Sequence, residues 1–241
     1  DSSSPYLLVC DHYGNRIPRK LGTLGVDDAD LQRHIAWDVG VNGLAEEFAR
    51  RFDATLIKQV YSRLVIDCNR PLDSATSIPV VSEHTEIPGN RDITPDVTAA
   101  RRREIFAPYH DAIAAILDRR LEAGIPTILL ALHSFTPIYH GETRPWHVGL
   151  LYNRDARLAA LFLKLLAEDE TLCLGDNQPY TVDDFSDYTI PVHGEQRQIP
   201  HLLFELRHDM IERQSDQYRW AHRLAGTLER ALEHAPELIG R

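Results

Sequence analysis

The order of apolar and polar residues along this chain predicts strands that alternate with helices. Short β-branched or leucine-rich runs, typical of buried strands, occur in six places. They are residues 6–10, 55–60, 63–67, 127–132, 148–152 and 201–206. Strands that alternate with helices favour a mostly parallel sheet covered on both faces. The short Tyr61-Ser62 connection between the second and third runs favours one antiparallel pair.

Apolar side chains recur at helical spacing in three further segments. These are Val41, Leu44, Phe48 and Phe52, then Ile105, Ile113 and Ile116 within residues 95–123, and finally Trp220, Leu224, Leu228 and Leu232. This succession predicts the α/β fold class, with a mixed, mostly parallel sheet sandwiched by helices. Residues 71–95 are rich in Pro, Ser and Thr, so we expect either a lid over a site or an inert insertion.

The length and composition are typical of one globular domain, which we expect to span residues 1–241. Of these residues, 43% are hydrophobic and 26% are charged. A formal charge of −10 repels phosphate backbones, so nucleic acid is not an expected partner. No stretch reaches the roughly 20 apolar residues of a membrane-spanning helix, and the first residues lack the pattern of a signal peptide. We therefore expect no membrane partner.

The cysteines indicate a reducing environment. The chain has three of them, Cys10, Cys68 and Cys173, which is an odd number, and they are widely spaced. Two of them lie in apolar runs, as reduced core residues do. We expect a cytoplasmic protein, because disulfides persist mainly in oxidising compartments.

Two histidines directly follow apolar runs, where ligands gather in open α/β sheets. Residues 7–10 lead into Asp11 and His12, and residues 128–132 lead into His133. Two imidazoles at one sheet edge suit zinc, which accepts nitrogen and carboxylate ligands and keeps an open position for catalysis. The alternative is that each histidine only caps its strand by hydrogen bonding.

Hydrolysis at a zinc ion bound by two histidines needs a third protein ligand and a general base. Asp38 is our choice for the ligand, although it can equally cap the helix that follows. Asp11 is an alternative ligand or an orienting partner for a histidine. Glu205 ends the last apolar run and suits the general base, unless it pairs with Arg207 instead.

Residues 63–70 end a further apolar run with a guanidinium beside an amide. This combination suits bidentate recognition of a substrate carboxylate. Arg70 is the expected clamp. Arg63 either assists it or polarises the scissile carbonyl, and a surface ion pair is the alternative for both.

Four segments of the chain together resemble the N-formylglutamate amidohydrolase family. They are residues 10–18 (Cys-Asp-His-Tyr-Gly-Asn-Arg-Ile-Pro), residues 61–71 with their Asp-x-Asn-Arg-Pro ending, residues 132–134 (Leu-His-Ser) and residues 204–206 (Phe-Glu-Leu). The family is similar in fold to zinc carboxypeptidases, the phosphorylase/hydrolase-like fold, and to the aspartoacylase and succinylglutamate desuccinylase group.

The resemblance implies a zinc-dependent amidohydrolase that converts N-formyl-L-glutamate to formate and L-glutamate at the end of histidine degradation. It implies one Zn²⁺ ion, or another divalent metal, on His12, His133 and Asp38, since the family carries an aspartate ahead of the corresponding helix. The carboxypeptidase pattern has a glutamate ligand where this chain has Asn15, which leaves the carboxylate ligand open between Asp38, Asp11 and Asn15.

The same resemblance implies a small-molecule substrate bound by Asn69 and Arg70, with His193 lining the pocket. Three alternatives to this function stay open. They are a metallocarboxypeptidase, another N-acyl amino acid hydrolase of the aspartoacylase type, and a non-catalytic binding protein on the same fold.

Overall fold

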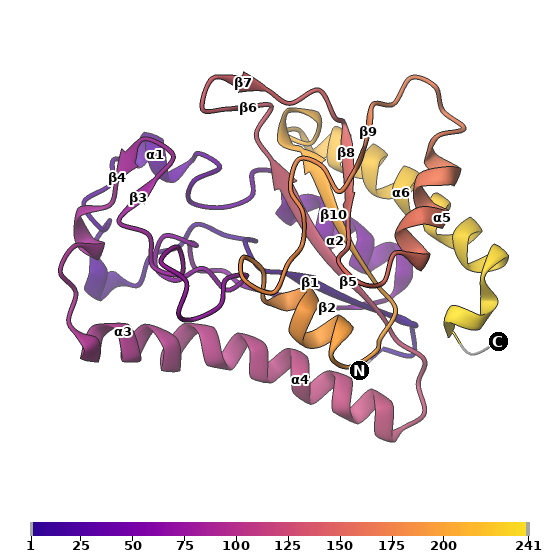
Figure 1. Ribbon diagram of the computed structural model, residues 1–241, viewed down its shortest axis with the longest axis horizontal. Coiled ribbons are helices and arrows are strands. Elements are labelled where there is room, and N and C mark those ends of the chain that lie inside the picture. The colour runs from indigo at the N-terminus through magenta and orange to yellow at the C-terminus, as the bar shows by residue number, and fades with distance from the viewer. Residues whose placement is uncertain (1, 240–241) are drawn as a thin grey trace.

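A six-stranded mixed sheet forms the centre of the protein (Figure 1). The computed structural model describes residues 2–239. Across the sheet the strands follow the order β2 (Thr55–Lys58), β1 (Tyr6–Cys10), β5 (Ile128–Phe135), β10 (His201–Arg207), β8 (Val148–Leu151) and β9 (Leu174–Asp176). The α/β prediction with a mostly parallel sheet is therefore confirmed.

Two neighbouring strands at one edge of the sheet, β8 and β9, run against the other four. The pairs β1/β2, β1/β5 and β5/β10 are parallel, β8 is antiparallel to β10, and β9 is parallel to β8. The antiparallel pair is thus not at the Tyr61-Ser62 connection, where we predicted it. The strand β9 and the helix α5 (Arg157–Leu166) were not predicted.

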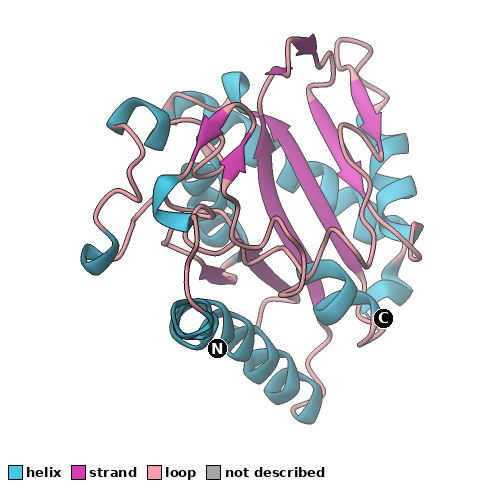
Figure 2. Ribbon diagram, turned by 60° about the vertical axis from the view of Figure 1, so that its left-hand side comes forward, coloured by secondary structure: helices cyan, strands magenta, loops and turns pink. Residues whose placement is uncertain are grey.

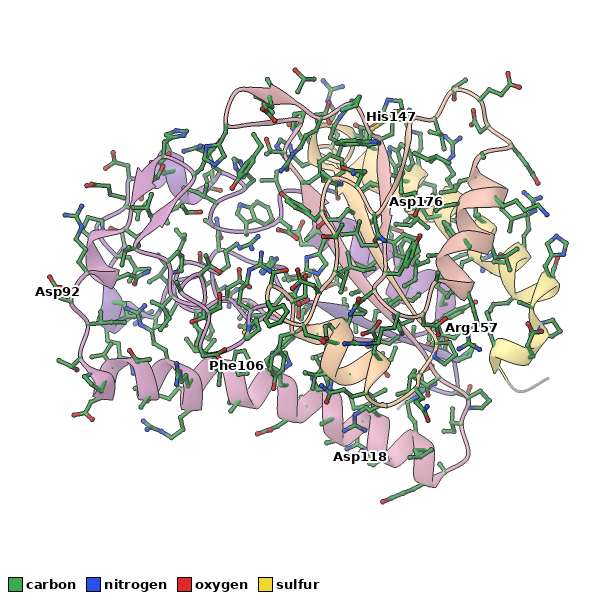
Figure 3. All side chains as sticks on the ribbon, viewed as in Figure 1. Asp92, Phe106, Asp118, His147, Arg157 and Asp176 are labelled. Atoms are coloured by element: carbon green, nitrogen blue, oxygen red, sulfur yellow. The ribbon has the colours of Figure 1, made fainter. Side chains whose placement is uncertain are left out.

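Helices cover both faces of the sheet (Figure 2). One face carries α2 (Val41–Phe52), α5 and α6 (Gln214–His234). Along the other face runs a long helix, in which α3 (Pro95–Arg101) and α4 (Ala107–Glu122) are joined by a π-helical turn at Arg102–Phe106. Figure 3 marks Phe106 on this helix, and its ring meets the Tyr188 ring at 4.9 Å between centroids.

Short elements complete the structure. They are the helix α1 (Asp28–Leu31), the 3-10 turns Arg19–Leu21, Pro88–Asn90, His208–Met210 and Pro236–Ile239, the π-turn Ile190–Glu195, and two hairpins. One hairpin joins β3 (Val81–Ser82) to β4 (Thr85–Glu86), and the other joins β6 (Ile138–Tyr139) to β7 (Glu142–Thr143). The 71–95 segment therefore contains a hairpin and a 3-10 turn.

Alternate residues of the central strands supply two separate cores. Leu8, Leu130 and Phe204 pack among α2, α5 and α6. Their neighbours Val9 and Leu203 point to the other face, where residues of α4 and the long loops cover them. Because side chains alternate between the faces of a strand, both faces of these strands have to be apolar. The continuous apolar runs in the sequence reflect this double burial.

The apolar run at residues 63–67 is a series of buried turns, so the strand predicted there is wrong. Side chains satisfy its carbonyl groups in place of a neighbouring strand. Asn90 Nδ2 donates to Leu64 O at 2.8 Å, and Arg101 Nη1 donates to Val65 O at 2.8 Å. Buried backbone groups need partners of some kind, and here amide and guanidinium donors supply them.

Within residues 2–239, no helix combines the length and the apolar character needed to cross a membrane.

Candidate metal centre and substrate cleft

The carboxyl ends of β1 and β5 bring the two predicted histidines together. His12 lies two residues after the end of β1, and His133 lies in β5, with the two ring centroids 5.1 Å apart. Asp38 reaches the same point from the loop before α2, where its backbone N–H donates to His12 O at 3.0 Å. All three side chains are buried. The helix α2 has Gly40 at its N-cap and no side-chain cap, so Asp38 does not cap it.

His12, Asp38 and His133 form a group that can hold a metal ion. One ligand atom from each residue lies within 4.8 Å of the other two. The two carboxylate oxygens of Asp38 face different histidines, with His12 Nδ1 at 3.4 Å from Oδ1 and His133 Nδ1 at 2.9 Å from Oδ2. Two nitrogens and one carboxylate are the donor set of many catalytic zinc sites.

A second carboxylate holds the far nitrogen of each histidine. His12 Nε2 lies 2.7 Å from Asp67 Oδ1, and His133 Nε2 lies 3.0 Å from Asp11 Oδ2. With Nε2–H donating outward to these carboxylates, each Nδ1 would present its lone pair to an ion bound in place of the Nδ1 proton. His12 Nδ1 is buried and makes no hydrogen bond within the described chain. These features fit a bound cation.

The charges around the group also favour a cation. Burial raises the pKa of Asp11, but the hydrogen bonds from His133 and Thr189 and the charges of His133 and His12 together outweigh it and bring the pKa down to about 2. Burial likewise opposes ionisation of Asp38, while His12 and His133 hold its pKa well below the usual range. The same contacts raise the pKa of His133 far above its usual value, despite burial. Protons on the histidines thus occupy the place that a metal ion takes in a loaded site.

Glu205 lies beside this group on the neighbouring strand. It is the register partner of His133 in the β5/β10 pair, and both continue the face of the sheet to which Ala131 and Leu203 belong. Glu205 is 7% exposed, and its Oε2 makes no hydrogen bond among the described residues. Burial raises the pKa of Glu205 to about 7. Arg207 pairs with Asp209 and not with Glu205.

Arg63 borders the histidine and carboxylate group on the cleft side. Its Nε donates to Asp67 Oδ2 at 2.9 Å, and its Nη1 lies 3.6 Å from Asp38 Oδ1. Asp67 thereby connects Arg63 to His12. No role was predicted for Asp67 from the sequence, although this residue follows an apolar run just as Asp11 and His133 do.

Arg70 lies at the cleft wall with its guanidinium partly engaged. Its Nη1 donates to Asn69 O at 3.1 Å and to Ser186 O, and it lies 3.8 Å from Asp187 Oδ1. The Asn69 side chain holds the same loop, since its Nδ2 donates to Asp187 Oδ1 at 3.0 Å. Its Oδ1 accepts the backbone N–H groups of Tyr188 and Thr189. The Asn69 amide therefore anchors the loop at residues 186–189 beside Arg70.

Two of the residues considered in the sequence lie away from this centre. His193 is outside the cleft lining; it belongs to the π-turn at residues 190–195, and its Nε2 lies 3.0 Å from His110 Nδ1. The Asn15 side chain donates to Leu31 O at 2.9 Å and belongs to another part of the chain. Asp38 is accordingly the carboxylate that meets both histidines, and Asp11 orients one of them.

A cleft of about 560 Å³ opens over the histidines. Its floor includes His12, Asp38, His133 and Glu205, and its walls include Arg63 and Arg70. The segment at residues 76–83 lines one side, and Tyr139 and Tyr180 line another. This volume suits a small molecule, since ligand pockets commonly measure about 300–1,000 Å³.

Comparison with known proteins agrees with this architecture. A crystal structure of a gene product from Agrobacterium tumefaciens is similar over 97% of this chain and 92% of that one, with a TM-score of 0.93 and 37% identity. The crystal structure of N-formylglutamate amidohydrolase from Ralstonia eutropha JMP134 is similar over 95% of this chain and 96% of that one, with a TM-score of 0.69. At 19% identity, this second likeness shows the fold alone.

No curated protein matches the chain in sequence. The family model described as N-formylglutamate amidohydrolase does match it, over residues 4–212. This match covers most of the chain and includes all the cleft residues named above. The chain therefore belongs to the N-formylglutamate amidohydrolase family.

Proposed function

We propose that this protein is a zinc-dependent amidohydrolase that cleaves an N-acyl amino acid, with N-formyl-L-glutamate as the leading substrate. The observation that carries the proposal is the convergence of His12, Asp38 and His133 beside Glu205, whose buried Oε2 has no hydrogen-bond partner within residues 2–239. Family membership supports the reaction class. In the proposed reaction, water adds to the acyl carbon and the C–N bond breaks, which gives a carboxylic acid and a free amino acid.

In this proposal His12 Nδ1, His133 Nδ1 and one oxygen of Asp38 hold the ion. The donor set suits Zn²⁺, although other divalent metals use the same ligand types. When bound, the ion supplies Lewis-acid polarisation of the acyl carbonyl and lowers the pKa of water. Asp67 and Asp11 keep the two imidazoles in the required tautomer, because each accepts the Nε2–H of one histidine.

Glu205 is the proposed general base and acid. Its Oε2 has no partner in the described chain, so it is free to take a proton from the attacking water. It then delivers that proton to the nitrogen of the departing amino acid. A pKa close to 7 suits both steps, because a group near the working pH accepts and returns a proton readily.

Arg70 is the proposed partner of the substrate's α-carboxylate, and Asn69 positions the loop against which Arg70 rests. A planar guanidinium can form two parallel hydrogen bonds to a carboxylate. Arg63 lies nearer to Asp38 and suits contact with the acyl oxygen. This division would place the acyl group over the histidines and the amino acid toward Arg70.

A panel of N-formyl, N-acetyl and N-succinyl amino acids tests the proposal. The zinc-loaded protein is expected to release the free amino acid from N-formyl-L-glutamate faster than from the acetyl or succinyl analogues. Inclusion of a peptide with a free C-terminus tests for carboxypeptidase activity. A zinc-loaded protein that hydrolyses none of these compounds would exclude the proposed function and favour a binding protein.

A further inference from the structure

Arg144 lies between two tyrosine rings at the rim of the cleft. Its guanidinium carbon is 4.4 Å from the Tyr139 ring centroid and 4.7 Å from the Tyr180 ring centroid. Its Nη1 also donates to the Tyr180 hydroxyl at 2.7 Å. Arg144 lies in the segment that leads from β7 to β8, close to His147, which is labelled in Figure 3. Both rings line the cleft, so they fix the guanidinium immediately behind its wall.

The charge of Arg144 is not balanced by any ion pair with a carboxylate among residues 2–239. The other two arginines of the cleft differ in this respect. Arg63 pairs with Asp67 at 2.7 Å, and Arg70 lies 3.8 Å from Asp187. In a chain with a formal charge of −10, an arginine at a cleft without a carboxylate partner is positioned for an anionic ligand.

The Tyr180 hydroxyl connects Arg144 to the cleft through a hydrogen bond. Because its oxygen accepts the hydrogen bond from Arg144, its own O–H proton must point elsewhere. Tyr180 is 42% exposed and lines the cleft with Glu205 and Arg63. A tyrosine phenol is protonated at neutral pH and can therefore donate. A carboxylate in the cleft is a suitable acceptor for this proton, since charge-assisted hydrogen bonds are stronger than neutral ones.

We propose that Tyr180, backed by Arg144, binds the side-chain carboxylate of an acidic N-acyl amino acid. The inference rests on the proposed function and deepens it, because it assigns the specificity for the amino acid to a second anion site. Arg70 would then bind the α-carboxylate of the substrate, and the Arg144–Tyr180 pair would bind its side-chain carboxylate. In this arrangement Tyr180 touches the substrate, and Arg144 is a positioning residue that orients the phenol and supplies positive charge.

The test compares N-formyl-L-glutamate with N-formyl-L-glutamine, which differ only in the side-chain carboxylate. Dissociation constants and kcat/KM are measured for zinc-loaded wild type, Tyr180→Phe and Arg144→Gln. Tyr180→Phe keeps the ring against Arg144 and removes only the hydroxyl. Arg213→Gln is the matched control, because Arg213 is an exposed residue before α6 and its replacement changes the net charge equally.

Wild type and Arg213→Gln are expected to prefer the acid. In Tyr180→Phe and Arg144→Gln the preference should fall by about tenfold or more, with N-formyl-L-glutamine bound as in wild type. An unchanged preference in Arg144→Gln overturns the inference, as does an equal loss for both ligands. If wild type hydrolyses neither compound, the proposed function fails, and the dissociation constants alone decide the inference. A wild type that does not bind the acid more tightly than the amide overturns it.

Discussion

Replacement of Glu205 by Gln removes the proposed general base while preserving the shape of its side chain. Glu205 is 7% exposed, and its Oε2 has no hydrogen-bond partner in residues 2–239. The substitution therefore breaks no hydrogen bond of that atom within the described chain, and the fold and the metal group should persist. General acid–base catalysis contributes about 10²- to 10⁴-fold to rate, so kcat should fall by about that factor. The loss corresponds to about 2.7–5.5 kcal/mol of transition-state stabilisation.

The assay is steady-state hydrolysis of N-formyl-L-glutamate by zinc-loaded protein, with metal content and thermal unfolding measured on the same samples. KM should stay close to the wild-type value, because the change removes an interaction made only in the transition state. Glu170→Gln, at an exposed position, provides the matched control. A Glu205→Gln enzyme with full metal content and wild-type kcat would refute the assignment of the base.

The pH profile of the wild type gives a second readout of the same residue. A base must be deprotonated to act, so kcat/KM should rise with pH through the pKa of Glu205. Burial raises this pKa from 4.5 to about 7, and a cation held beside the carboxyl group lowers it again. The acidic limb of kcat/KM should therefore lie between pH 4.5 and 7 and be absent from the residual activity of Glu205→Gln. An identical limb in the variant would assign it to another group.

Three further predictions concern the metal group and the proposed clamp. His12→Ala and His133→Ala should each lose bound zinc and activity with little change in the far-ultraviolet circular dichroism spectrum; full metal content in both would contradict the ligand assignment. Asp67→Asn and Asp11→Asn should each weaken zinc affinity by about 10- to 100-fold, measured by chelator competition, because each removes the acceptor that orients one imidazole. Arg70→Ala should lower kcat/KM for an N-acyl amino acid by about tenfold or more but leave kcat/KM for its α-carboxamide unchanged, with Arg70→Lys intermediate. If wild type and Arg70→Ala prefer the acid over the carboxamide to the same degree, Arg70 has a structural role.

Much of the sheet could be predicted because its central strands are buried on both faces. The runs in β1, β5 and β10 are apolar without interruption, which is typical of parallel strands under two helical layers. The residues at their carboxyl ends were accordingly placed near one another. This reasoning located His12, His133 and Glu205 from their positions alone.

The segment at residues 63–67 shows the limit of that reasoning. Its apolar sequence is equally compatible with a strand and with buried turns, because both exclude water. The deciding interactions come from Asn90 and Arg101, which satisfy its carbonyl groups from far along the chain. The local sequence around residues 63–67 gives no sign of these distant hydrogen-bond donors.

The residues that surround the two histidines could not be predicted from the local sequence. Asp38 was chosen by resemblance, since its local sequence suited a helix cap as well as a ligand. Asp67 was overlooked as a partner of His12, although its place after an apolar run was a usable signal. Arg144 and Tyr180 come from loops that only the tertiary fold brings together.

The central claim is that one metal ion binds to His12, Asp38 and His133. Anomalous diffraction from a crystal of zinc-loaded protein, recorded above and below the zinc absorption edge, tests it most directly. The account predicts a single strong anomalous peak bound by His12 Nδ1, His133 Nδ1 and an oxygen of Asp38, with Glu205 next to the open side of the ion. A zinc-loaded crystal with no peak between these three residues, or with the ion bound elsewhere, would contradict it.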